Sequence, residues 1–106
     1  MKTTQAETYE ELKARFRMEW QQRKARRFEE ASKHAQVIAR IPRNNIIIEI
    51  RRAMRSHGFR SDYKQVPQYW ALEYKDGKLT HGRSITENAY QQAKIYALKN
   101  HGIVLP

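Results

Sequence analysis

The chain has 106 residues, and its 21 lysines and arginines against 11 aspartates and glutamates give a net charge of +10. This length suits one domain, or a compact domain with one extended helix. The absence of cysteine excludes disulfide bonds, thiolate metal ligands and thiol nucleophiles, and no segment approaches the roughly 18 apolar residues of a membrane-spanning helix. The first 20 residues also lack the apolar core of a signal peptide. We therefore expect a cytoplasmic protein with a polyanionic or acidic partner, because phosphate backbones and acidic protein surfaces both attract such a charge.

Residues 4–40 predict a long helix. Thr4 and Glu7 have the spacing of a capping box, and apolar residues then recur at intervals of three, four or their sums, as one helical stripe requires. The members of this stripe are Tyr9, Leu12, Phe16, Trp20, Phe28, Ala31, Ala35 and Ile38. Pro42 ends the run, since the residue before a proline is disfavoured in a helix. A break near residues 21–25, giving two shorter helices, is the alternative.

Residues 45–57 predict a second helix with Asn45 as its N-cap. Its apolar side would comprise Ile46, Ile47, Ile50 and Met54. A short buried strand over residues 46–50 is the alternative, because a short apolar run fits either structure. The basic run 51–55 favours the helix.

Residues 69–101 predict a strand, a turn, a second strand and a helix. Asp76-Gly77 is the strongest hairpin signal in the chain, and Gly102 follows the last helix at the position of a C-terminal cap. Alternation in the first strand places three residues on one face, which we expect to pack under the last helix: Trp70, Leu72 and Tyr74.

These elements predict an α+β fold with a long N-terminal helix, a second helix, and then a β-hairpin packed on a C-terminal helix. We divide the chain into residues 1–41, a long basic amphipathic helix, and residues 42–106, a small helix followed by the strand-strand-helix unit. A connector precedes the hairpin, and the isomer of its Val66–Pro67 bond is left open.

Two clusters of basic residues are candidate contact surfaces. The first lies in the long helix and comprises Arg23, Lys24, Arg26 and Arg27. The second comprises Arg51, Arg52, Arg55 and Arg60. On a helix, Arg51, Arg52 and Arg55 would share the face opposite the apolar one. The planar guanidinium binds phosphate and carboxylate groups with two hydrogen bonds, so we expect a contact role above all for the second cluster. The first cluster also fits a solvated, ion-paired helix.

The hairpin interleaves aromatic and basic residues, as surfaces that stack on bases and contact phosphates do. Its candidate residues are Tyr69, Lys75, Lys78, His81 and Arg83. Together with the turn Lys75-Asp76-Gly77-Lys78 and the helix start Thr86-Glu87-Asn88-Ala89, this segment resembles the strand-strand-helix DNA-binding modules of phage integrase N-termini and plant AP2-type domains. The resemblance implies that the sheet enters the major groove and that these five candidates contact DNA.

In size, charge and lack of a catalytic motif, the whole chain also resembles the small accessory proteins of temperate bacteriophages. Among these are the anti-RecBCD proteins, which redirect the host nuclease that processes DNA ends. This second resemblance implies a protein partner, namely an acidic surface of a host enzyme that acts on nucleic acid.

The sequence predicts neither enzymatic activity nor a cofactor. No two histidines have the i,i+3 or i,i+4 spacing of a helical metal site, and there is no glycine-rich phosphate loop or nucleophile elbow. The enzymatic alternative is a nuclease built from scattered acids, such as Glu49, Asp62, Glu73 and Asp76. We predict a non-enzymatic protein that binds nucleic acid through its arginines. Docking on a host nucleic-acid enzyme is the alternative, and self-association through the long helix is a third option.

Overall fold

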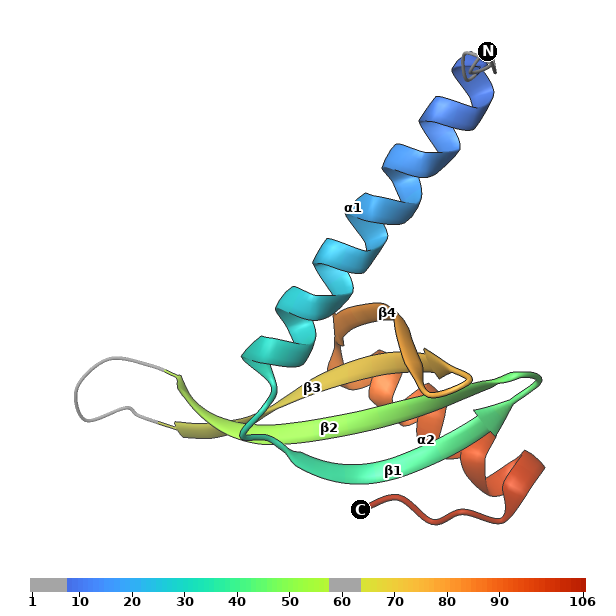
Figure 1. Cartoon of the computed structure of the whole chain (residues 1–106). Helices are drawn as coiled ribbons and strands as arrows, with labels where there is room; N and C mark the ends of the chain where they lie inside the picture. The colour runs from blue at the N-terminus through green and yellow to red at the C-terminus, as the bar shows by residue number, and fades with distance from the viewer. Residues whose placement is uncertain (1–7, 58–63) are drawn as a thin grey trace, which may run out of the picture.

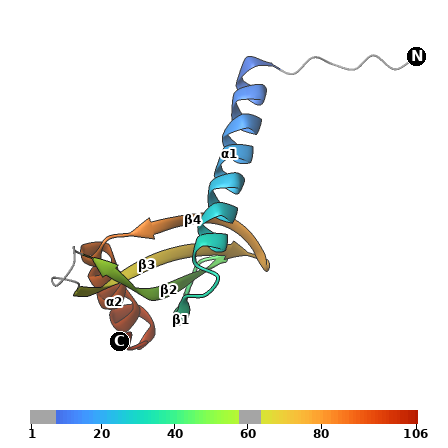
Figure 2. The same ribbon diagram turned by 90° about the vertical axis from the view of Figure 1, so that its left-hand side faces the viewer.

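The computed structural model describes residues 8–57 and 64–106 and has the expected α+β fold (Figure 1). Its elements are α1 (Tyr9–Ala31), β1 (Gln36–Arg43), β2 (Ile46–His57), β3 (Lys64–Lys75), β4 (Lys78–Ile85) and α2 (Glu87–His101). The strands form an antiparallel sheet in the order β1-β2-β3-β4. The radius of gyration is 18.2 Å, against about 13 Å for a compact chain of this length. The excess arises because most of α1 projects away from the sheet (Figures 1 and 2).

A capping box begins α1. Thr8 accepts a hydrogen bond from the Glu11 amide at 3.1 Å, and its own amide donates to the Glu11 carboxylate at 3.4 Å. The box predicted from Thr4 and Glu7 lies outside the described residues.

The predicted continuous helix over residues 4–40 is wrong at its C-terminal end. The helix runs without a break through residues 21–25 and ends at Ala31. The following segment forms β1, where Ile41 lies opposite Ile48 of β2. Residues 28–38 keep a helical spacing, but Val37 pairs with Arg51 of β2 and Ile38 packs against the core. This tertiary pairing overrides the local pattern. The boundary predicted after residue 41 therefore lies inside β1.

The predicted helix over residues 45–57 is also wrong, because this segment is strand β2. Asn44 has a φ of 55° and forms a turn with Asn45 between β1 and β2, so Asn45 caps no helix. Asparagine tolerates this left-handed conformation. The alternative strand over residues 46–50 has the right type but is too short, since β3 pairs with β2 as far as His57.

The hairpin of β3 and β4 and the helix α2 confirm the prediction for residues 69–101. Asp76 and Gly77 have φ values of 52° and 79°, as the two central residues of a type I′ turn require. Thr86 begins α2 by accepting a hydrogen bond from the Ala89 amide at 3.1 Å, and Gly102, with a φ of 65°, ends it.

Pro67 lies within β3 rather than before it, because the strand begins at Lys64. At this position β3 pairs with β2 alone, since β4 joins it only from Tyr69 onward. A proline is tolerated at such an open edge. The Val66–Pro67 bond is trans, like the other described peptide bonds.

The two helices lie on opposite faces of the sheet (Figures 1 and 2). On the α2 side, Tyr69 stacks on Tyr90 with ring centroids 3.9 Å apart. The same core contains Ile41, Ile50 and Leu105, the last of which follows α2 in the C-terminal tail. Burial of these side chains holds α2 and the tail against the sheet.

Trp70, Leu72 and Tyr74 point to the α1 side, so their predicted position under the last helix is wrong. Leu72 is fully buried beside Gly82 and Ala25, and Tyr74 contacts the C-terminal end of α1. Alternation correctly groups these three residues on one face. It carries no information on which helix covers that face.

Gly82 lets α1 approach β4 closely. A β-carbon added there would lie 3.0 Å from Ala25 Cα, 3.1 Å from Ala25 O and 3.0 Å from Leu72 Cδ2. Two of these three atoms belong to the backbone of α1, which cannot move aside by a rotamer change. The absence of a side chain at residue 82 therefore sets the spacing between α1 and the sheet.

We predict that Gly82→Ala lowers the free energy of unfolding by about 1–3 kcal/mol, because the added methyl overpacks this contact. Urea denaturation followed by circular dichroism measures the change. Ser84→Ala is the matched control, since Ser84 lies on the same strand and is exposed. Equal stability of the two variants would show that α1 does not depend on this close approach.

Candidate nucleic-acid interface

One face of α1 combines aromatic and basic side chains. At 100° per residue, eight residues fall within an arc of about 120°. We call this set the basic-aromatic face; its members are Tyr9, Lys13, Phe16, Arg17, Trp20, Arg23, Lys24 and Arg27. The acidic residues of α1 lie outside this arc. The face therefore presents five cations and three aromatic rings without an interposed carboxylate.

Most of the basic-aromatic face points away from the sheet, while Trp20 and Lys24 also line a cleft with β4. The centre of this face lies about 140° around the helix from Ala25, the buried residue of α1. Phe16 and Trp20 are 57% and 58% exposed, and the helix stands clear of the sheet along this length (Figure 2). A group of large exposed aromatic side chains commonly marks an interaction site.

Cations lie over the aromatic rings of this helix. Lys24 Nζ is 5.2 Å from the centre of the Trp20 ring, and the Arg15 guanidinium is 5.7 Å from that of Phe16. Both distances fall within the range of cation–π attraction. These contacts keep positive charge beside rings that remain open to a partner.

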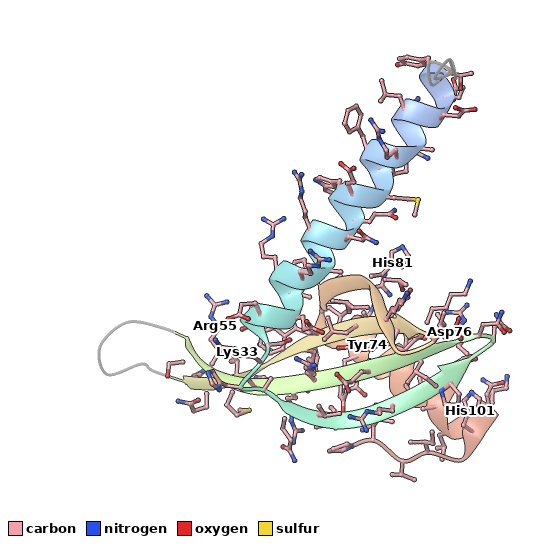
Figure 3. The ribbon with its side chains drawn as sticks, in the orientation of Figure 1. Lys33, Arg55, Tyr74, Asp76, His81 and His101 are labelled. Carbon is pink, nitrogen blue, oxygen red and sulfur yellow. The ribbon has the colours of Figure 1, made fainter. Side chains whose placement is uncertain are left out.

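A cleft of about 230 Å³ lies between α1 and β4. Trp20 and Lys24 line it from the helix, and His81 and Arg83 line it from the strand. Its acidic member is Glu73, whose Oε2 lies 3.4 Å from His81 Nδ1. Figure 3 shows His81 on β4 beside the projecting helix. The fold thus brings three predicted residues, Lys24, His81 and Arg83, into one site.

Arg51, the leading candidate from the sequence, forms internal contacts. Its Nε and Nη2 both lie 2.9 Å from Oε2 of Glu49, and its Nη1 donates to Ser32 Oγ at 3.2 Å and to the Glu29 carbonyl at 3.4 Å. The Glu49 side chain is 7% exposed and that of Arg51 is 14% exposed. Arg40 supplies a second cation to Glu49 at 3.0 Å. Arg51 therefore joins the end of α1 to the sheet.

Tyr74 belongs to the same network beneath α1 (Figure 3). Its hydroxyl donates to Glu29 Oε2 at 2.9 Å and accepts a hydrogen bond from Arg51 Nη2 at 3.4 Å. Burial, followed by the hydrogen bond to the Glu29 carboxylate, raises the pKa of Tyr74 to about 12. The hydroxyl thus stays protonated and keeps donating to Glu29 at neutral pH.

The structure does not bring the second predicted cluster together. Because β2 is a strand, successive side chains point to opposite faces, so Arg52 lies on the α2 side and Arg51 on the α1 side. Arg55 is exposed at the far end of the sheet from Asp76 (Figure 3). Arg60 lies outside the described residues, as does Asp62 of the alternative nuclease set.

The hairpin candidates are divided between core and surface. Tyr69 is buried against Tyr90, whereas Lys75, Lys78 and Arg83 are exposed. The hairpin therefore offers cations for phosphate contact, and its predicted aromatic contact is held in the core.

In the first predicted cluster, Arg23, Lys24 and Arg27 belong to the basic-aromatic face, and Arg26 lies outside it. Lys13 and Arg17 of this face are absent from the sequence-based candidates. A projection of the helix at 100° per residue is the signal that identifies them.

Comparison of the chain with family models, with curated proteins and with solved structures found no match. Across residues 8–57 and 64–106, no three His, Cys, Asp or Glu side chains gather as metal ligands would. In the same part of the chain, no helix carries an apolar run long enough to span a bilayer.

We predict that Arg51→Gln lowers the free energy of unfolding by about 2–3 kcal/mol, because the buried Glu49 carboxylate and the buried Ser32 hydroxyl lose their hydrogen bonds from Arg51. The loss stays below that of a fully broken buried ion pair, since Arg40 still neutralises Glu49. Urea denaturation gives the value. Arg55→Gln is the control, with a change within about 0.5 kcal/mol. A stable Arg51→Gln variant would refute the structural role of Arg51.

Proposed function

We propose that this chain is a non-enzymatic, cytoplasmic protein that binds nucleic acid through the basic-aromatic face of α1. This proposal rests on one observation. Five cations and three aromatic rings share one exposed arc of α1, and the acidic residues of α1 lie outside that arc. Residues 13–27 contain seven lysines and arginines and one glutamate, so the charge is concentrated on the projecting part of the molecule.

Phosphate contact accounts for the cations of this face, because neutralising phosphates releases condensed counterions. Stacking accounts for the aromatic residues, because every base presents a π-face to a ring such as that of Trp20. Both contacts are available together on a single strand, whose bases are not already stacked in a duplex. Single-stranded DNA or RNA is therefore the class of nucleic acid that we propose.

The cleft between α1 and β4 extends this surface. A strand lying along α1 would meet Arg83 and His81 beside Trp20 and Lys24. In this arrangement the hairpin contributes phosphate contacts from its edge. The resemblance to integrase-type modules implies a different arrangement, in which the face of the sheet contacts the bases.

The same face is poorly suited to a second copy of α1. Pairing two such faces would oppose five cations with five cations, and like charges at short range repel. A polyanion relieves this repulsion. For this reason we favour nucleic acid over self-association through the helix.

We predict that Trp20→Ala weakens binding of a labelled single-stranded oligonucleotide about tenfold or more, through the loss of base stacking. Arg23→Gln with Arg27→Gln should also weaken binding and reduce the slope of log K against log salt by about 1.4, at roughly 0.7 for each lost phosphate contact. Fluorescence anisotropy over a series of salt concentrations measures both quantities.

The matched control removes two exposed arginines outside the basic-aromatic face, by Arg26→Gln with Arg55→Gln. It should reduce the salt slope by less than half as much. Equal effects of the two double variants would mean that net charge alone governs binding. No measurable binding by the wild-type chain would refute the proposal.

A second candidate function is supported by the exposed apolar side chains of the projecting helix. Tyr9, Phe16 and Trp20 lie on one side of α1 and are each more than half exposed, and a helix with such anchors can lie in an apolar groove of a partner. In this form the protein would act as a phage-type accessory protein that docks on a host nucleic-acid enzyme.

The adaptor function predicts a partner that survives nuclease treatment in a pull-down from bacterial lysate, read by mass spectrometry. Phe16→Ala with Trp20→Ala should abolish its capture, since aromatic anchors dominate such interfaces, while Arg23→Gln with Arg27→Gln should retain it. Loss of every partner with nuclease would leave direct nucleic-acid binding as the function.

A further inference from the structure

A groove lies between α2 and the sheet, on the face opposite α1. Isoleucines of β1, β2 and β4 form its floor, and Ala89, Ala93 and Tyr96 of α2 form its wall. Its volume is about 400 Å³. The stacked rings of Tyr69 and Tyr90, which do not line the groove, hold α2 against β3.

Small side chains leave this groove open. Ala89 and Ala93 reach only a short distance toward the sheet, which leaves space between them and the isoleucines, while Tyr90 and Tyr96 of the same helix pack against the core beside it. A groove of this size falls in the usual range of small-molecule sites, about 300–1,000 Å³.

The charged side chains that line the groove are both cationic. Arg43 and Arg83 line it together with Gln92, and none of its lining residues is acidic. The Arg43 guanidinium lies 5.7 Å from the centre of the Tyr96 ring, which places this cation at the rim of the apolar space. An apolar molecule with an anionic group would match both the walls and the rim.

We propose that this groove binds a small organic anion with an apolar body, of the class of aromatic carboxylates. The apolar body lies between the isoleucines and the alanines of α2, and the carboxylate accepts hydrogen bonds from Arg43. Charge-assisted bonds of this kind are the stronger ones. The groove lies on the α2 side of the sheet and shares no residue with the basic-aromatic face of α1, although Arg83 lines both the groove and the cleft between α1 and β4.

The test measures binding of 2-naphthoate to the full chain by isothermal titration calorimetry, with 2-naphthalenemethanol as the neutral probe of similar shape. We expect saturable binding of one naphthoate per chain and about tenfold weaker binding of the alcohol, because the alcohol lacks the charge that Arg43 recognises. Arg43→Gln should weaken naphthoate binding about tenfold and leave oligonucleotide affinity unchanged.

Two further variants complete the test. Ala93→Phe should fill the groove and abolish naphthoate binding, with circular dichroism confirming its fold. Lys99→Gln should bind normally, since Lys99 is exposed on α2 and does not line the groove. No saturable binding by the wild-type chain, or equal affinity for the two probes, would overturn the proposal. So would unchanged binding by Arg43→Gln, or a dimer in sedimentation that Ala93→Phe dissociates.

Discussion

The guanidinium of Arg51 joins three parts of the molecule that are far apart in sequence. From β2 it reaches the last carbonyls of α1, the carboxylate of Glu49 and the hydroxyl of Tyr74. A cation at this place also suits the negative end of the helix dipole. Because α1 contacts the sheet through a short C-terminal stretch, this network and the close contact at Gly82 fix where the helix leaves the sheet. The exposure of the basic-aromatic face follows from that direction.

The arginines of this chain have different roles according to where the acids lie. Glu49 is buried and holds Arg51 and Arg40 on the sheet, so these cations are engaged in structure. Along α1, residues 13–27 contain one glutamate among seven basic residues, and the charge there is directed to the solvent. The net charge of the chain is therefore displaced toward its projecting end. This displacement favours an extended anionic partner over a compact one.

Local chemistry allowed part of the fold to be predicted. The Asp76-Gly77 turn and the Gly102 cap each depend on a few neighbouring residues, and both are confirmed. Residues 36–57 were not predictable in this way, because their strands form through pairing with distant segments. At the candidate site, the grouping of Arg51, Arg52 and Arg55 was wrong since it assumed a helix. The basic-aromatic face could be derived from the sequence once the limits of α1 were known.

The attachment of α1 at one end has a mechanical consequence. Residues 9–19 extend about 16 Å beyond the cleft that Trp20 lines with β4, at 1.5 Å per residue. A rotation of this projecting segment by 10° about its end at the cleft would move its N-terminal end by about 3 Å. This distance is close to the rise between successive bases in a stacked strand. For the single-stranded nucleic acid that we propose as partner, a rotation of this size would shift the free end of α1 by one base step without a change in the sheet. The stiffness of this attachment depends on the few contacts between the C-terminal end of α1 and the sheet.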